Sequence, residues 1–232
     1  MKTRNAILLL AITLLTAAPA RSGSFGLNIL TSEDIKAGSS DLAIPAPEAD
    51  LSVIDEPEAA SYLADSEPGA DMPEKNGAPA AARLGGDGMI KLYHEWSKES
   101  LEVRYRDEHG RYIPEAMARI KHFMRCRLTG REMDVPSKLV ELLDIIQEKA
   151  GGRTITVLCG YRSPELNGAL AGASGALAKN SLHMKGWAAD IRIDGVRTSA
   201  LRDIARAVLA GGVGYYPADG FVHVDVGPVR SW

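Results

Sequence analysis

The sequence is poor in several residue types that often decide a fold. Of its 232 residues only three are Phe and two are Cys. The cysteines, Cys126 and Cys159, lack the spacing of a zinc-ligand pair, so they predict either a disulfide of an oxidising compartment or a free buried pair. Beyond the first 20 residues, no stretch is apolar enough to cross a membrane, which takes about 20 apolar residues.

The charged residues are unevenly distributed along the chain. Residues 1–20 contain two basic and no acidic side chains, residues 21–82 contain 3 basic and 12 acidic ones, and residues 83–232 contain 22 and 18. The net charges are therefore +2, −9 and +4, in agreement with −3 for the whole chain. This asymmetry predicts three parts with different purposes, within a length that allows one domain and its tails.

The first part, residues 1–20, has the pattern of a secretory signal peptide. Lys2 and Arg4 precede an apolar run, and small residues follow up to Ala20. No Cys follows the run for lipid attachment, and no Arg-Arg pair suggests the twin-arginine route. We expect cleavage after Ala20, export to the periplasm and no stable membrane insertion afterwards, with an uncleaved anchor as the alternative.

The second part, residues 21–85, is rich in Ala, Pro, Asp and Glu and contains almost no aromatic side chains. Such a segment has too little apolar surface to offset the conformational entropy lost on ordering. We therefore expect a disordered acidic tether. A partner-binding role for residues 51–54, and an unknown regulator that acts through the tether, are further hypotheses.

Hydrophobic periodicity predicts secondary structure in the remaining part. Alternation over residues 100–106 and a turn after them predict a β-hairpin that returns through residues 111–113. Apolar residues at helical spacing predict three helices. One begins at Pro114, one is capped by Asp134, and the last ends at Gly211 and the glycine after it.

Two further segments, residues 154–159 and 221–226, are rich in β-branched residues and predict strands. The helices precede and interrupt the strands, so residues 86–232 are expected to form one α+β domain. Its about 147 residues suffice for a hydrophobic core. We expect a small antiparallel sheet with flanking helices.

The five histidines fall into two groups. Three lie among charged neighbours and are expected at the surface: His94, His109 and His122. Alternation in the segment after His183 places Asp190 opposite an apolar face, and alternation in residues 221–226 does the same for His223. Two imidazoles and a carboxylate on rigid backbone suit a catalytic zinc site, although such spacing also arises by chance.

One motif and its spacing carry a resemblance to a known family: Ser181-x-His183-x-x-Gly186-x-Ala188-x-Asp190, followed about 30 residues later by His223-x-Asp225. This pattern resembles the zinc D,D-peptidase family that cuts peptidoglycan peptides, and within it the exported murein endopeptidase branch formerly classed as a domain of unknown function. Further matches occur at residues 160–167, 212–217 and 227–232. The resemblance covers nearly all of residues 90–232.

The resemblance implies roles for individual residues. His183, Asp190 and His223 would bind zinc as the cofactor, on the sheet of a D,D-peptidase or hedgehog-like fold. Arg162 and Ser181 would be substrate-binding residues. The guanidinium would hold a substrate carboxylate or carbonyl through paired hydrogen bonds, with a structural salt bridge as its alternative. Ser181 would orient His183 or its loop.

The general base is the point at which the sequence departs from the family pattern. Many relatives place an acidic residue three positions before the last histidine ligand, and here that position is Gly220. Asp225 is our first catalytic candidate, as the base or as the residue that orients a ligand. Asp219 is the second candidate, and the third option is that neither is the base.

The activity implied by the resemblance is zinc-dependent hydrolysis of peptide cross-links in peptidoglycan. Its partners would be stem peptides, and no role for nucleic acid is expected. A D,D- or L,D-carboxypeptidase that trims stem peptides and a non-catalytic peptidoglycan-binding module are the alternatives. The intact ligand triad argues against the binding module. The sequence leaves the cleaved bond, endo or exo action and the oligomeric state open.

Overall fold

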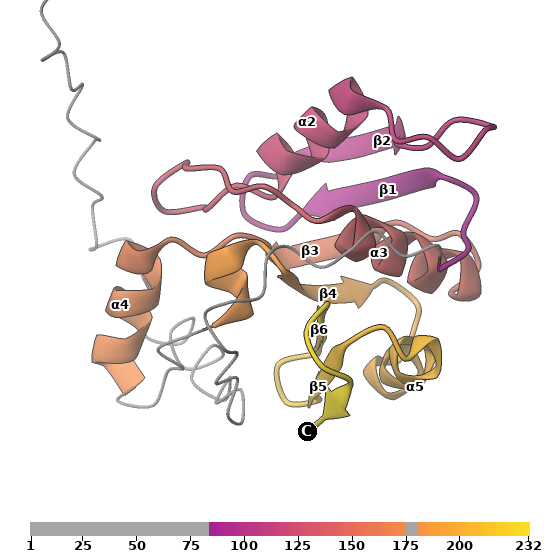
Figure 1. Ribbon diagram of the computed structural model, residues 1–232. Coiled ribbons are helices and arrows are strands. Elements are labelled where there is room, and N and C mark those ends of the chain that lie inside the picture. Colours follow the sequence, from indigo (N-terminus) through magenta and orange to yellow (C-terminus); the bar gives the residue numbers. More distant parts are fainter. Residues whose placement is uncertain (1–83, 175–180) are drawn as a thin grey trace, which may run out of the picture. The chain divides into compact units, whose positions relative to one another are not determined.

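The computed structural model describes residues 84–174 and 181–232. The predicted signal peptide and nearly all of the predicted tether lie outside the described residues. The described part of the chain is an α+β domain built on a seven-stranded sheet (Figure 1), as expected from the sequence. None of its helices combines the length and the apolar character that a membrane span requires.

The sheet is larger than predicted and is not purely antiparallel. Its strand order is β2-β1-β3-β4-β6-β5-β7. The bounds are Met89–His94 (β1), Ser100–Arg104 (β2), Ile155–Cys159 (β3), Ala188–Ile193 (β4), Gly212–Tyr216 (β5), Phe221–Asp225 (β6) and Arg230–Ser231 (β7). β1 pairs with β3 in parallel and β5 with β7 in parallel, while the other neighbours are antiparallel. The prediction of a small antiparallel sheet is therefore wrong, because helices between β1 and β3 return the chain in the same direction.

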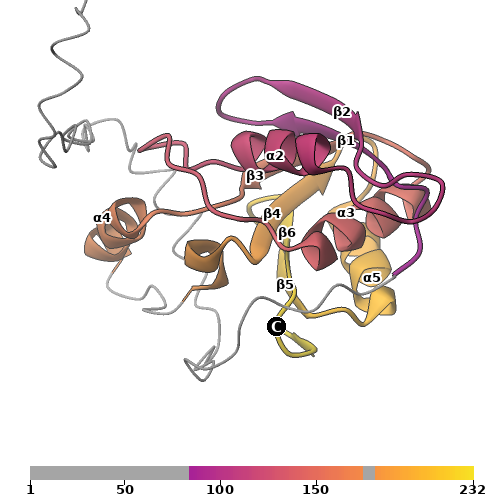
Figure 2. The same cartoon turned by 45° about the horizontal axis from the view of Figure 1, so that its top comes forward.

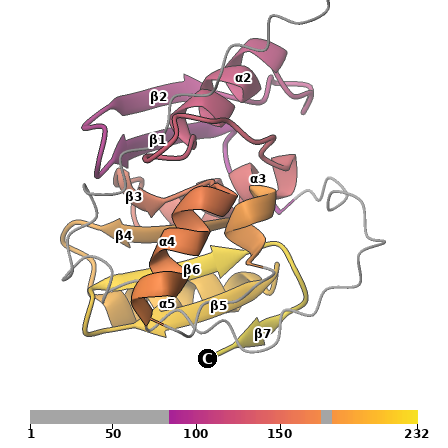
Figure 3. The ribbon, with the colours of Figure 1, turned by 90° about the vertical axis from the view of Figure 1, so that its left-hand side faces the viewer.

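The helices lie on both faces of this sheet. They are α2 (Pro114–Phe123), α3 (Ser137–Lys149), α4 (Pro164–Ser174), α5 (Thr198–Val208) and the 3₁₀-helix η2 (Leu182–Lys185). α2, α3 and α5 contribute buried residues to the same core as the strands, and α3 lies next to α5 (Figure 2). In Figure 3, α4 crosses in front of the strands, whereas α5 lies behind them.

The main core occupies the α5 side of the central strands. On β4 and β6 the apolar residues that face this side are Ala189, Ile191, Ile193, Val222 and Val224. Successive side chains of a strand point to opposite faces, so Asp190 and His223 project to the face away from α5. This alternation follows the pattern expected from the sequence.

The first strands differ from the predicted hairpin. β2 pairs with β1, which precedes it, rather than with residues 111–113. The predicted pairing is reduced to one bridge between Arg106 and Tyr112. β1 was not predicted, although Ile90 and Leu92 place two fully buried side chains in the core. Pairing of β2 with β1 buries these two side chains, which stabilises this pairing over one with the short segment after the turn.

All three predicted helices and both further predicted strands are present, but some of their ends differ. The residue that caps α3 is Pro136, not Asp134, whose Oδ1 accepts a hydrogen bond from Lys121 Nζ at 2.7 Å. α5 ends at Leu209, which has a φ of 56°, before the predicted glycines. Gly212 instead begins β5, so its backbone belongs to the sheet.

Candidate metal centre

Four neighbouring strands place one residue each in a single row across the sheet. Cys159 on β3 lies opposite Asp190 on β4, Asp190 opposite His223 on β6, and His223 opposite Gly214 on β5. A β-bulge in β3 between Val157 and Cys159 shifts the register and brings the thiol into this row. Directly paired residues present their side chains on the same face, so the row gathers its metal-binding groups in one place.

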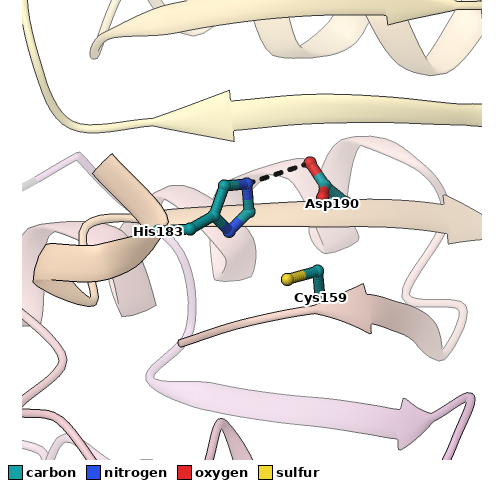
Figure 4. Close-up of side chains that lie close together, drawn as sticks. All are labelled: Cys159, His183 and Asp190. Atoms are coloured by element: carbon teal, nitrogen blue, oxygen red, sulfur yellow. Dashed lines mark ion pairs between the residues drawn. The ribbon is translucent and has the colours of Figure 1, made fainter. Parts of the chain in front are cut away.

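His183 reaches this row from η2 rather than from a strand. Ser181 precedes η2, and its Oγ accepts a hydrogen bond from the backbone N–H of His183 at 3.3 Å. Gly186 ends η2 with a φ of 70°, and a Cβ there would lie 2.7 Å from the carbonyl oxygen of Asp134. Figure 4 shows the His183 ring directed at Asp190, with Cys159 on the adjacent strand.

The side chains of His183, Asp190 and His223 converge on one point. His183 Nε2 lies 3.2 Å from Asp190 Oδ1 and 3.1 Å from His223 Nδ1, and His223 Nδ1 lies 3.0 Å from Asp190 Oδ1. All three side chains are fully buried. Ligand atoms of a tetrahedral zinc site with bonds of about 2.0–2.1 Å are about 3.3 Å apart. The three atoms therefore have nearly the mutual spacing of zinc ligands.

Contacts on the far side of each ring determine which nitrogen carries the proton. His183 Nδ1 lies 2.8 Å from the carbonyl oxygen of Gly160, which can only accept, so this nitrogen donates. His223 Nε2 lies 3.3 Å from Asp225 Oδ2 and donates in the same way. In their neutral forms both imidazoles then direct a lone pair toward Asp190. Metal-binding histidines are usually held in this manner.

Asp190 supplies the negative charge of the centre. Its Oδ2 is buried, accepts no hydrogen bond within residues 84–174 and 181–232, and lies 3.8 Å from Arg162 Nη2. A buried carboxylate oxygen without a donor is costly unless a positive charge compensates for it. Arg162 supplies such a charge on the side of Oδ2, while the other oxygen, Oδ1, lies beside the two imidazole nitrogens, an arrangement that fits a divalent cation such as zinc.

The electrostatics of the centre also favour a cation. Burial alone lowers the pKa of His223, but hydrogen bonds to Asp190 and Asp225 outweigh burial and raise the pKa to about 10. Burial acts in the same direction on His183, and the charge of Asp190 nevertheless holds its pKa well above the usual value. Burial raises the pKa of Asp190, yet the two imidazoles hold it well below its usual range. A metal ion must therefore displace protons from this site.

The Asp225 carboxylate is occupied on both oxygens. Oδ1 accepts hydrogen bonds from the backbone N–H groups of Gly212 and Gly227 at 2.9 and 2.8 Å and from Arg230 Nη1 at 3.2 Å. Oδ2 faces His223 and forms an ion pair with Arg230 Nη2 at 2.9 Å. Burial raises the pKa of Asp225, but His223 and Arg230 hold it well below its usual range. The carboxylate thus accepts contacts from two backbone N–H groups, Arg230 and His223, and fixes the positions of these groups.

Of the other predicted site residues, Arg162 contacts the centre and Asp219 does not within the described residues. Arg162 is fully buried next to the centre, and its backbone N–H donates to the carbonyl oxygen of His183 at 3.2 Å. Asp219 lies in the turn between β5 and β6, and partial burial raises its pKa. No hydrogen bond or ion pair joins Asp219 to the centre within the part of the chain that the structure describes.

Comparison with known proteins decides the family. The family model Peptidase_M15_2, described as peptidoglycan L,D-endopeptidase MepK, matches residues 85–232. The chain belongs to this family. Peptidoglycan L,D-endopeptidase MepK of Escherichia coli K12 is 38% identical over 145 residues, which are 62% of this chain and 79% of that protein. The probable MepK of Haemophilus influenzae is 39% identical over 123 residues, 52% of this chain and 66% of that protein.

Membership of the MepK family confirms the resemblance to peptidases that act on peptidoglycan. The family match includes every residue of the centre and every residue of the motif that carried the resemblance. Its description names an L,D-endopeptidase, which agrees with the murein endopeptidase branch that the resemblance indicated and adds the class of bond. The sequence left the cleaved bond open, and the names of the relatives specify an L,D bond for those proteins.

Cys159 is a potential metal ligand that the sequence spacing did not indicate. Its Sγ, one ring nitrogen of His183 and one carboxylate oxygen of Asp190 lie within 4.8 Å of one another, a group able to hold a metal ion. The bulge in β3 hides this relation, because a regular strand would place the neighbouring residue in the row. Both Cys159 and Cys126 are free and buried, so they form no disulfide with each other, and the alternative of a free buried pair is the one observed.

The sequence also misplaced one histidine and missed two residues near the centre. His94 is 3% exposed rather than at the surface, and its Nδ1 accepts hydrogen bonds from the backbone N–H groups of Trp96 and Ser97. Arg230 contacts Asp225, and Trp232 packs beside His223 with ring centroids 5.3 Å apart. The matches at residues 227–232 gave no signal for these contacts, since pairing of β7 with β5 creates them.

Proposed function

We propose that this protein is an exported, zinc-dependent endopeptidase that hydrolyses L,D peptide bonds in the cross-links of periplasmic peptidoglycan. Family membership makes the chain a peptidoglycan-acting peptidase, and the names of its relatives supply the class of bond. The observation that carries the zinc proposal is the convergence of three ligand atoms, on His183, Asp190 and His223, within 3.2 Å of one another.

In this proposal His183, Asp190 and His223 hold the zinc. When bound, zinc polarises a carbonyl group and lowers the pKa of a water molecule to about 7. The chain supplies placement: the Gly160 carbonyl fixes the His183 ring, and Asp225 fixes the His223 ring. A set of three such protein ligands would be typical of a catalytic rather than a structural zinc site.

Arg162 is proposed to act on the centre through Asp190. The guanidinium is fully buried and lies 3.8 Å from Asp190 Oδ2, so its charge offsets that of the carboxylate. Its backbone also holds the carbonyl of His183. This is the salt-bridge alternative that the sequence left open. Ser181 is proposed to orient the His183 loop as the cap of η2.

Of the two base candidates, Asp225 is proposed as the residue that orients His223. Its two oxygens already accept contacts from two backbone N–H groups, one guanidinium and one imidazole. A general base must instead reach the attacking water with a free acceptor site. Asp219 lies in the turn before β6, and its replacement by Asn tests whether it takes part in proton transfer.

The deciding experiment is digestion of purified peptidoglycan sacculi with the purified protein. Mass spectrometry of the soluble products identifies the bond that breaks, and the proposal expects new amines from cross-links that contain an L,D bond. Release of single terminal residues would instead indicate a carboxypeptidase. Retention of the protein on sacculi without new amines would indicate a binding module and overturn the proposal.

Two controls tie the activity to the metal centre. Stringent chelation should abolish digestion and zinc should restore it, because the ion supplies the Lewis acid. His183→Ala should be inactive, whereas His109→Ala should retain activity, since the exposed His109 side chain forms its ion pair with Glu108, at 3.6 Å, and not with the centre within the described residues. Undiminished digestion by His183→Ala would refute the proposed centre.

A further inference from the structure

The segment Arg230–Trp232 lies along the β5 edge of the candidate metal centre and contacts it from two sides. β7 pairs in parallel with β5, with Arg230 opposite Gly212. The backbone N–H of Trp232 donates to the carbonyl of Val213 at 3.2 Å, and that of Tyr215 donates to the carbonyl of Trp232 at 3.1 Å. The backbone of the segment is therefore fixed to the sheet rather than resting loosely on it.

Arg230 makes a two-pronged contact with Asp225. Its Nη1 lies 3.2 Å from Oδ1 and its Nη2 lies 2.9 Å from Oδ2 of the carboxylate. The hydrogen bond from Nη1 and the ion pair of Nη2 together hold the carboxylate from both oxygens. Space for the pair exists because residue 212 is glycine, since a Cβ there would lie 2.3 Å from Asp225 Oδ2 and 2.5 Å from Arg230 Nη1.

Trp232 packs beside the ring of His223. The ring centroids are 5.3 Å apart with an interplanar angle of 47°. The indole is held in place by Tyr216, whose hydroxyl accepts a hydrogen bond from Nε1 at 2.7 Å, and by Arg230, whose Cζ lies 4.8 Å from the ring centroid. These contacts restrict the indole to one orientation next to the imidazole.

Gly214 makes room for this arrangement. It lies opposite His223 in the row of four strands, and a Cβ there would meet Trp232 Cε2 and Cζ2 at 2.9 Å. The space that a side chain of residue 214 would occupy is therefore filled by an indole from elsewhere in the sequence. At Gly214 the row therefore contributes no metal ligand, and the indole of Trp232 packs against His223 there instead.

We propose that Arg230 and Trp232 are positioning residues that set the metal affinity of His223. Arg230 acts through Asp225, which holds the proton on His223 Nε2 so that Nδ1 presents its lone pair. Trp232 acts through the ring, because a packed imidazole cannot turn its Nδ1 away from Asp190. The proposal rests on the proposed function, in which His223 binds zinc. Removal of such supporting contacts typically weakens metal binding 10–100-fold.

The test compares Arg230→Lys with a matched variant, Arg202→Lys, in the full chain. Arg202 also lies over an aromatic ring, Tyr215 at 4.4 Å, and also pairs with a carboxylate, Asp203 at 2.8 Å, but it belongs to α5 behind the sheet. Zinc affinity is measured by competition with a chromophoric chelator. We expect Arg230→Lys to weaken binding about 10–100-fold and Arg202→Lys to change it less than twofold.

Two further measurements separate positioning from a purely structural role. The absorption spectrum of the cobalt-substituted protein reports the ligand geometry, and it should change in Arg230→Lys but not in Arg202→Lys. Trp232→Leu should weaken zinc binding roughly tenfold, and Trp232→Phe should restore part of the affinity by replacing the ring. The thermal midpoint of the metal-free protein should be similar in all of these variants. Should Arg230→Lys fail to fold, the two Trp232 variants carry the test.

Failure of this inference is distinguishable from failure of the proposed function. If His183→Ala loses zinc binding while Arg230→Lys and Trp232→Leu bind within twofold of the unaltered chain, the positioning role is refuted and the zinc centre stands. An equal loss in Arg230→Lys and Arg202→Lys also refutes it. If the unaltered chain binds no zinc, the centre and the positioning role are both overturned.

Discussion

This domain contains two buried polar clusters. They differ in whether each hydrogen-bond acceptor faces a donor. The first, here called the α3 network, joins three side chains of α3 to donors on the preceding segments: Glu141, Asp144 and Gln147 with Leu84, Gly88, Lys91, Tyr105, Arg106 and Tyr112. Each of these contacts joins a donor to an acceptor at 2.7–3.0 Å. Asp144 Oδ2 alone receives the N–H of Gly88 and the hydroxyl of Tyr105.

The metal centre shows the opposite arrangement. There the lone pairs of two imidazoles and one carboxylate face one another, and their donors point outward to Gly160 and Asp225. Both clusters bury carboxylates, so burial alone does not separate structure from function. The distinguishing property is that two ring nitrogens and a carboxylate oxygen converge on one point, which is occupied by protons in the metal-free protein and by acceptors alone once both imidazoles are neutral, so that a cation can replace the protons.

The largest expected effect comes from Asp190→Asn, which keeps the shape of the side chain and removes its charge. We expect loss of stoichiometric zinc binding and a fall in kcat/KM on the order of 10³-fold, because several kcal/mol of transition-state stabilisation depend on the metal. The denaturant midpoint of the metal-free protein should also fall, because the buried guanidinium of Arg162 loses its counter-charge. Muropeptide kinetics and equilibrium unfolding measure the two effects, and retained zinc binding would abolish the distinction between the clusters.

Glu141→Leu should give a different result in the α3 network. It removes the acceptor of Arg106 Nη1 and of the Tyr112 hydroxyl from a position that is 0% exposed, so we expect a loss of about 3 kcal/mol in the free energy of unfolding. Zinc affinity should be unchanged. Glu102→Leu is the control, since its exposed ion pair with Lys91 at 3.4 Å contributes at most about 1 kcal/mol. Equal losses in the two variants would contradict this prediction.

The pH dependence of zinc affinity gives a third, smaller effect. In the metal-free protein the pKa of His223 is raised to about 10, so a proton occupies this site below pH 10 and zinc must displace it. Affinity should therefore fall as pH falls, by about tenfold per pH unit between pH 9 and 7 for each displaced proton. Calorimetry in buffers of different ionisation enthalpy counts the protons released. Affinity independent of pH in this range would contradict the protonated state.

The smallest effect is expected for Asp219→Asn. Within the described residues its carboxylate makes no hydrogen bond or ion pair with the centre, so we expect less than a threefold change in kcat/KM, well under 1.4 kcal/mol. Steady-state kinetics with cross-linked muropeptides measure it. A loss above about 100-fold would identify Asp219 as the general base instead.

The sequence predicted the parts of the site that local periodicity and motif spacing control. Alternation in β4 and β6 placed Asp190 and His223 opposite the apolar face, and the motif around His183 indicated the third proposed ligand. The positions of these three side chains depend on backbone features within a few residues of each. Patterns of this kind are visible in a single chain because the strand period is short.

The rest depends on contacts between distant segments. The register that puts Cys159 in the row results from a bulge, and the role of Asp225 results from Gly212, 13 residues earlier, and from β7. Sequence patterns did not predict β1, because β1 is a central strand only through its pairing with β2 and β3, and such pairing is not visible in the local sequence. His94 was assigned to the surface from its charged neighbours, although burial depends on which face of β1 carries it.

β4 and β6 each present one set of alternate residues to α5 and the other set to the metal centre. The two sides of these strands are thus subject to separate constraints. Substitution of a valine on the α5 side alters how tightly the sheet packs, whereas substitution of Asp190 or His223 alters what the opposite side can bind. A divergent relative could therefore lose its chemistry through a single exchange in either strand and still keep an intact scaffold.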